Sequence, residues 1–180
     1  MRVTTAALAF AVVGSIMLTI ATSVCGASAP SKPAGGSVRF IETPTSATTG
    51  SIIITGAVGD YGTVVSVDKN GATEPNGKYL KVALKKGSFM VNGTAIVEKE
   101  KTTSFPINHS SCSSSGSISA PVTLFGGAGL YQRIRGTVRV TETFAWVLAR
   151  HTSGAQEGQC DGHDITKMVV ATIGSGKVRF

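Results

Sequence analysis

One carboxylate stands out in the sequence because it interrupts an apolar pattern. From Gly136 to Arg150, apolar and polar residues alternate with a period of two, as in a β-strand with one buried face. Glu142 falls on the apolar face, between Val140 and Phe144. Either the strand is near an end or a bulge there and the carboxylate reaches water, or it points into the interior of a barrel. In the second case it needs a partner or a raised pKa, and it becomes a candidate ligand contact or acid–base group.

The length of this strand also bears on the fold. At about 3.3 Å per residue it is more typical of a barrel than of a small sandwich. Aromatic residues lie on its apolar face and in the glycine-rich segment before it. The candidate ligand contacts are therefore Glu142, Phe144, Trp146 and Tyr131. Glu142 is the only candidate for catalysis.

Two cysteine–histidine pairs with mirrored spacing form a second constellation. His109-x-x-Cys112 and Cys160-x-x-His163 together match the ligand spacing of a Cys2His2 zinc site. Zinc requires thiolates, whereas an exported protein in an oxidising compartment favours a disulfide. We predict a disulfide between Cys112 and Cys160, with the four-residue zinc site as the alternative. No cofactor is expected.

Several other functions lack their sequence patterns. The glycine-rich segment 125–136 is followed by neither Lys-Ser/Thr nor a helix, so it is not a nucleotide-binding loop. The serines of segment 110–115 lack a Gly-x-Ser-x-Gly elbow, which argues against a serine hydrolase. The net charge of +7 is explained either by solubility and the protection of exposed strand edges or by contact with an anionic envelope component. Aromatic residues make up only 6%, too few to stack bases, so no nucleic-acid partner is expected.

The N-terminal segment has the layout of a secretory signal. Arg2 precedes an uncharged apolar stretch, Ala6 to Val24, and small residues follow it. We predict a signal peptide over residues 1–27, a flexible linker over residues 28–36 and one β domain over residues 37–180. A retained membrane anchor and lipidation of Cys25 are the alternatives. The expected location is secreted, extracellular or in the cell envelope, with no transmembrane segment after processing.

The remaining chain indicates strands and turns. Charged residues are only 15% and there are 22 glycines, which argues against long solvated helices, and no substantial helix is expected. Apolar or β-branched runs predict strands at residues 38–42, 51–55, 61–68, 78–84 and 89–91. Asn92-Gly93 between two apolar runs predicts a hairpin leading into a further strand at 94–97. Residues 102–119 are expected to form a polar, serine-rich loop.

A set of motifs occupies the C-terminal part of the chain. They are Gly127-Ala128-Gly129-Leu130-Tyr131, Ile134-Arg135-Gly136-Thr137, Gly158-Gln159-Cys160 and a final segment from Gly174 to Phe180. In this order they resemble dirigent-like and allene-oxide-cyclase-like β-barrels, and more closely small secreted proteins of actinobacteria. The likeness spans Val122 to Phe180. It implies an all-β fold, a single antiparallel up-and-down barrel of roughly eight strands whose last strand pairs near the first.

The resemblance does not transfer an activity, because the polar site residues of the plant cyclases have no one-to-one match in this chain. We expect a non-catalytic secreted barrel that binds a small apolar ligand or a cell-envelope or surface partner. One alternative is a cyclase- or isomerase-like enzyme that acts on a hydrophobic substrate inside the barrel, with Glu142 inward. The other is a structural or host-facing envelope protein. These alternatives depend on whether the barrel is hollow, which the sequence leaves open.

Overall fold

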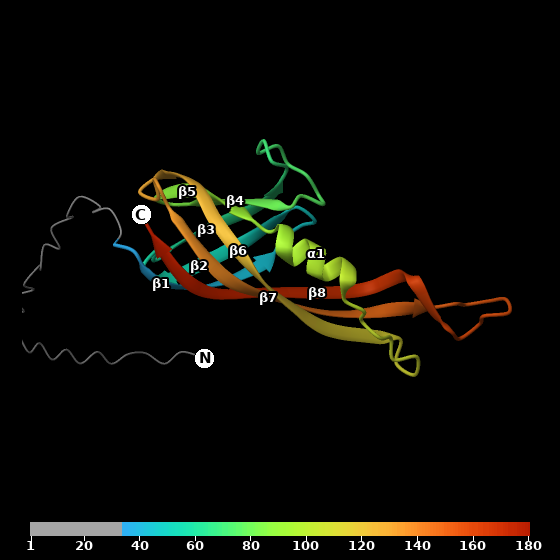
Figure 1. Ribbon diagram of the computed structural model, residues 1–180. Helices are drawn as coiled ribbons and strands as arrows, with labels where there is room; N and C mark the ends of the chain where they lie inside the picture. The colour runs from blue at the N-terminus through green and yellow to red at the C-terminus, as the bar shows by residue number, and fades with distance from the viewer. Residues whose placement is uncertain (1–33) are drawn as a thin grey trace, which may run out of the picture.

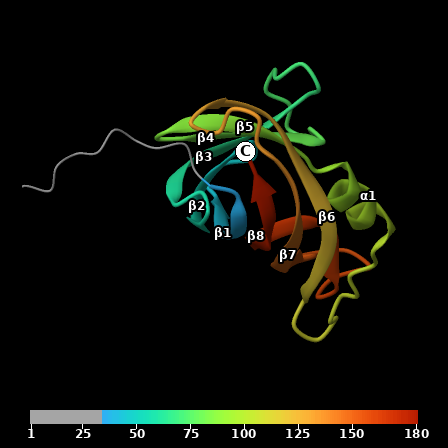
Figure 2. The same ribbon diagram turned by 60° about the vertical axis from the view of Figure 1, so that its left-hand side comes forward.

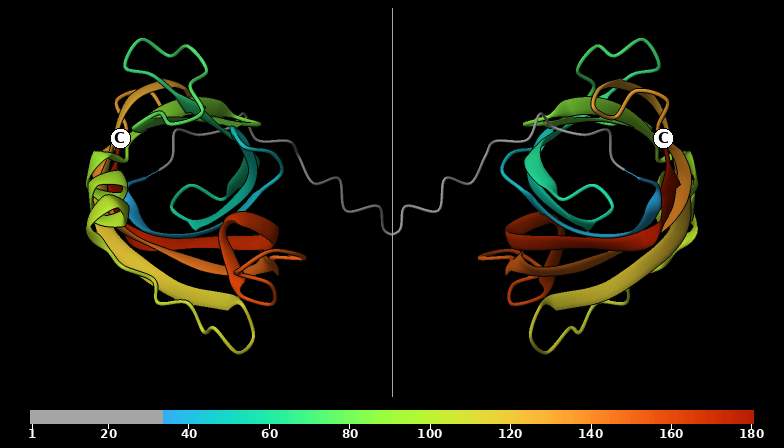
Figure 3. Two further views of the ribbon diagram at one scale, coloured as in Figure 1. Left: turned by 90° about the vertical axis from the view of Figure 1, so that its right-hand side faces the viewer. Right: turned by 90° about the vertical axis from the view of Figure 1, so that its left-hand side faces the viewer.

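The computed structural model describes residues 34–180, which form a closed barrel of eight antiparallel strands. The strands are β1 (Gly36–Pro44), β2 (Thr49–Gly56), β3 (Asp60–Val67), β4 (Tyr79–Leu84), β5 (Gly87–Asn92), β6 (Ser113–Gly129), β7 (Arg135–Arg150) and β8 (Cys160–Arg179). Each strand pairs with the next along the chain, and β8 pairs with β1 to close the ring (Figures 1 and 3). The expected all-β single barrel, with its last strand beside its first, is confirmed.

The predicted signal peptide lies outside the described residues 34–180. The predicted signal peptide, its cleavage site, Cys25 and most of the predicted linker fall on residues 1–33. Within residues 34–180, no helix is long and apolar enough to cross a membrane.

The period-two pattern of the sequence decides which side chains enter the barrel. In β2, Ile52 and Ile54 are buried, whereas Ile53 between them is 62% exposed. Successive side chains of a strand point to opposite faces, so Ile53 is exposed although the isoleucines on either side of it are buried. The same alternation buries valines of the other strands around one shared core.

The predicted hairpin at Asn92-Gly93 is wrong. After β5 the chain enters a short helix, α1 (Thr94–Thr102), and Gly93 has a φ of −98°, not the positive φ that such a hairpin turn needs. The Asn92 side-chain oxygen instead accepts a 3.0 Å hydrogen bond from the Thr94 backbone amide. The helix lies beside β6 (Figure 2), and Ile96 packs against Ile118 and Ala120 on the face of that strand that points toward the cavity, which Ile96 also lines. A single buried anchor and a charged run, residues 98–101, suit an exposed helix better than a strand.

The predicted loop over residues 102–119 is wrong from Ser113 onward. The serine-rich segment is the first part of β6 and pairs residue by residue with β7; Ser117, for example, lies opposite Thr143. Small polar residues are accepted there because β7 supplies the backbone hydrogen bonds and the segment is partly exposed. The strands β6, β7 and β8 thereby reach 17, 16 and 20 residues. They continue past the barrel as a three-stranded extension, which we call the arm (Figure 1).

Candidate ligand-binding cavity

The barrel interior contains a cavity of about 210 Å³. All eight strands contribute to its wall, which is built mainly from aliphatic side chains: Val38, Ile52, Ile54, Val64, Val82, Val91, Val122, Val138, Val140 and Val170. Valine is short and branched at Cβ, so its methyl groups cover the wall without reaching the axis of the barrel. The interior is therefore hollow.

One end of the cavity is closed by the turn between β6 and β7. Tyr131 in this turn has no exposed surface, and its ring packs edge-on against Phe89 and, tilted, against Phe180. Its hydroxyl donates a 2.7 Å hydrogen bond to Asp60 Oδ2. The burial of this phenol and its bond to a carboxylate both raise the pKa of Tyr131 above its ordinary value.

Toward the other end the lining becomes polar. Glu42 of β1, Thr172 of β8 and Glu142 of β7 all line the cavity, and we call these three residues the polar rim. The strand register brings them together, because Thr172 lies opposite Glu42 on one side and opposite Glu142 on the other. Thr172 is only 6% exposed. The loop between β1 and β2 completes this end of the cavity.

The carboxylates of the polar rim are in an unfavourable environment for negative charge. Burial, together with the negative charges of Glu100 and Glu42, raises the pKa of Glu142 to about 7. Burial also raises the pKa of Glu42, although a hydrogen bond with Thr172 opposes the shift. Near neutral pH, Glu142 is thus divided between its neutral and charged forms.

The four predicted ligand contacts lie in three different parts of the structure. Glu142 points inward, as the second interpretation of its strand face required. Phe144 and Trp146 lie on the same face of β7 but beyond the barrel, where each ring packs against Phe105 at a centroid distance of 5.6 Å. Tyr131 lies at the closed end. Of the four, only Glu142 lines the cavity, and the binding roles of the other three stay predictions.

Two members of the polar rim, Glu42 and Thr172, were not predicted as site residues. Glu42 follows Val38 and Phe40 at a spacing of two. The alternation argument used for Glu142 in β7 therefore also places Glu42 on the inward face of β1. Thr172 carries no comparable signal, because threonine is common on either face of a strand. Only the pairing of β8 with both neighbours shows that it joins the two carboxylates.

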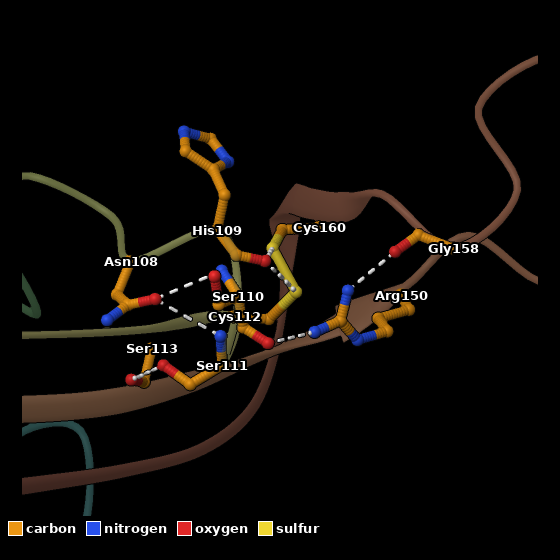
Figure 4. The surroundings of a disulfide bond; sticks show 9 residues. All are labelled: Asn108, His109, Ser110, Ser111, Cys112, Ser113, Arg150, Gly158 and Cys160. Carbon is orange, nitrogen blue, oxygen red and sulfur yellow. Dashed lines mark hydrogen bonds between the residues drawn. A yellow bond between two sulfur atoms is a disulfide. The ribbon is translucent and has the colours of Figure 1, made fainter.

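The predicted disulfide between Cys112 and Cys160 is confirmed (Figure 4). It lies near the end of the arm farthest from the barrel, beside the β7–β8 connection. Arg150 stabilises the same region, since its guanidinium donates to the carbonyl oxygens of Ser110 at 2.7 Å and Gly158 at 2.6 Å. Both sulfur atoms are bonded to each other, which overturns the zinc alternative with His109 and His163. The described part of the chain also holds no cluster of three or more metal-ligating side chains.

No protein-family model, curated protein or solved structure matches this chain. The likeness to dirigent-like and cyclase-like barrels therefore remains one of short motifs.

Proposed function

We propose that this protein is a secreted binding protein that holds a small apolar ligand inside its barrel. The observation that carries the proposal is the aliphatic cavity of about 210 Å³, whose polar groups gather at one end. An unfilled cavity costs stability because its lining lacks contact partners, and an apolar ligand restores those contacts. Pockets of this composition, with a few convergent polar groups, are typical small-molecule sites.

The size and polarity of the cavity limit the ligand. An apolar cavity of about 150 Å³ in another protein accommodates benzene. The somewhat larger space here suits a single ring or a short alkyl chain. Because the polar rim lies at one end, we expect the ligand to carry one polar group and to enter with its apolar part first.

Secretion is part of the same proposal. The disulfide supports it, because disulfides persist in oxidising compartments outside the cytosol. The signal-like layout of residues 1–27 supports it independently.

Calorimetric titration with octan-1-ol tests the binding proposal. The variant Val140→Phe fills the cavity, and Val147→Phe makes the same change on the same strand at an exposed position. We expect saturable binding at one site by the natural protein and by Val147→Phe, and affinity at least tenfold lower for Val140→Phe. Absence of saturable binding, or equal affinity of all three proteins, contradicts the proposal.

Catalysis inside the barrel is a second candidate, favoured by the position of Glu142. A general acid or base works best with a pKa near the working pH, and burial together with two neighbouring negative charges brings the pKa of Glu142 to about 7. In this alternative Glu142 removes a proton from an apolar substrate and returns it at another atom, as an isomerase does. The test is to extract the purified protein with organic solvent and to incubate any apolar compound that is recovered with fresh protein in D2O. Catalysis is supported if the natural protein introduces deuterium into the compound and the Glu142→Gln variant binds the compound without doing so. A compound recovered free of deuterium contradicts catalysis.

A further inference from the structure

We propose that the polar end of the ligand is a cation, an alkylammonium or similar group bound between Glu42 and Glu142. This inference rests on the proposed binding function and adds the chemical class of the ligand.

The geometry of the polar rim suits an ammonium group. Adjacent strands lie about 4.8 Å apart, so Glu42 and Glu142 face each other across β8 at roughly twice that spacing. Thr172 occupies the position between them and offers a hydroxyl oxygen. A primary ammonium has three N–H donors, which matches these three oxygen-bearing side chains.

The backbone keeps one of these carboxylates at the cavity. At Gly50 in β2 a Cβ atom would collide with Glu42 Oε1, so the carboxylate occupies the space that the missing side chain leaves. Glu42 is therefore packed against β2 at the end of the cavity, and Gly50 itself lines the same space.

The charged side chains that line the cavity are both negative. The cavity lining contains no Lys, Arg or His, and no salt bridge within residues 34–180 involves Glu42 or Glu142. Glu100 on α1 adds a third negative charge that acts on Glu142. The neighbours of Glu142 across the sheet, Ile118 of β6 and Thr172 of β8, carry no charge.

A half-buried carboxylate without a cationic partner is in an unfavourable environment, and a bound cation supplies the opposite charge that the cavity lining lacks. The same arrangement disfavours a fatty acid, whose carboxylate would add another negative charge at the rim. The raised pKa values of both glutamates agree with the missing partner, because a nearby cation would lower them.

Three probes with the same alkyl chain separate charge recognition from apolar binding. Octylammonium, octan-1-ol and octanoate are titrated by calorimetry at pH 8. We expect octylammonium to bind at least tenfold more tightly than octan-1-ol, and octanoate to bind most weakly. At pH 5 the octylammonium preference falls because Glu142 takes up a proton, whereas an alkylammonium, with a pKa of about 10, keeps its charge.

Matched variants test whether the preference for octylammonium depends on the glutamates of the polar rim. Glu142→Gln and Glu42→Gln are each expected to weaken octylammonium binding about tenfold and to leave octan-1-ol binding within twofold. Glu74→Gln removes the same charge at an exposed position outside the cavity and should change neither affinity. Retained octan-1-ol binding shows that each variant is folded.

The outcomes separate the two proposals. Equal affinities for the three probes, tightest binding of octanoate, or unchanged octylammonium binding by both rim variants overturns the cation inference and leaves apolar binding intact. Failure of all three probes to bind overturns the proposed function and the inference with it.

Discussion

Tyr131 and Asp60, 71 residues apart in the sequence, are joined by a 2.7 Å hydrogen bond at the closed end of the barrel. Asp60 also accepts hydrogen bonds from the backbone amides of Tyr61 at 2.8 Å and Lys86 at 2.9 Å. Burial by itself would raise the pKa of Asp60, but these three hydrogen bonds outweigh it and hold the pKa below its ordinary value. One carboxylate thus connects the β6–β7 turn, the start of β3 and the β4–β5 turn.

Replacing Tyr131 by Phe should destabilise the fold by about 1.5–3 kcal/mol, the usual range for a hydrogen bond to a charged group. Because the pKa of Asp60 is lower in the folded state, its contribution is present above its unfolded pKa and lost as the pH falls through the folded value. Urea unfolding should therefore show a larger loss at pH 7 than at pH 2.5. Tyr61→Phe removes the hydroxyl of a 57% exposed ring and should stay within about 0.5 kcal/mol. Equal losses in the two variants would argue against the anchoring role.

Glu142 should make the protein less stable as the pH rises from about 4.5 to 7. The unfolded chain gives up this proton near the ordinary value of 4.5, while the folded chain keeps it until about pH 7, so deprotonation favours unfolding. The resulting loss is at most about 3 kcal/mol. Glu142→Gln should match the natural protein at pH 4.5 and exceed its stability at pH 8. A difference in urea midpoint that does not vary with pH would contradict the half-buried position of this carboxylate.

Loss of the disulfide should loosen the arm and spare the barrel. The bond closes a loop with a sequence separation of 48 residues, for which the chain-entropy model gives about 4 kcal/mol of stabilisation. In the double variant Cys112→Ser/Cys160→Ser, amide hydrogen exchange should accelerate around the two former cysteines and remain unchanged in β2 and β3. The natural protein in reducing agent serves as the control and should give the same pattern. Faster exchange throughout the barrel would show that the arm and barrel unfold together.

Gly174→Ala should destabilise the barrel, because a Cβ at this position of β8 would collide with the ring of Phe40. Phe40 lines the cavity, so its displacement should also reduce the space for ligand. Overpacking of this kind costs about 1–3 kcal/mol. Gly162→Ala is the matched control on the same strand, where nothing lies within 4 Å of the added atom. Thermal unfolding of the two variants measures the difference, and equal melting temperatures would contradict the close contact at Gly174.

Much of the barrel follows from local sequence patterns. Alternation in β2 and β7 decides which side chains point inward, because the pleat sends successive residues to opposite faces. The same argument placed Glu142 on the apolar face of its strand, with an inward carboxylate as one of two interpretations. The predicted signal peptide left two cysteines, which indicated the disulfide. These features depend only on neighbours in the chain or on chemistry that the residues carry with them.

Tertiary structure decided the rest. Residues after Asn92 form a helix because β6 offers a surface on which Ile96 packs, and the serine-rich segment is a strand because β7 pairs with it. The cavity exists because eight strands close at a radius that valine side chains do not fill. The polar rim depends on the register of β8 with β1 and β7, since a slip of one residue would turn Thr172 to the outside. Such contacts join distant segments, and no local pattern encodes them.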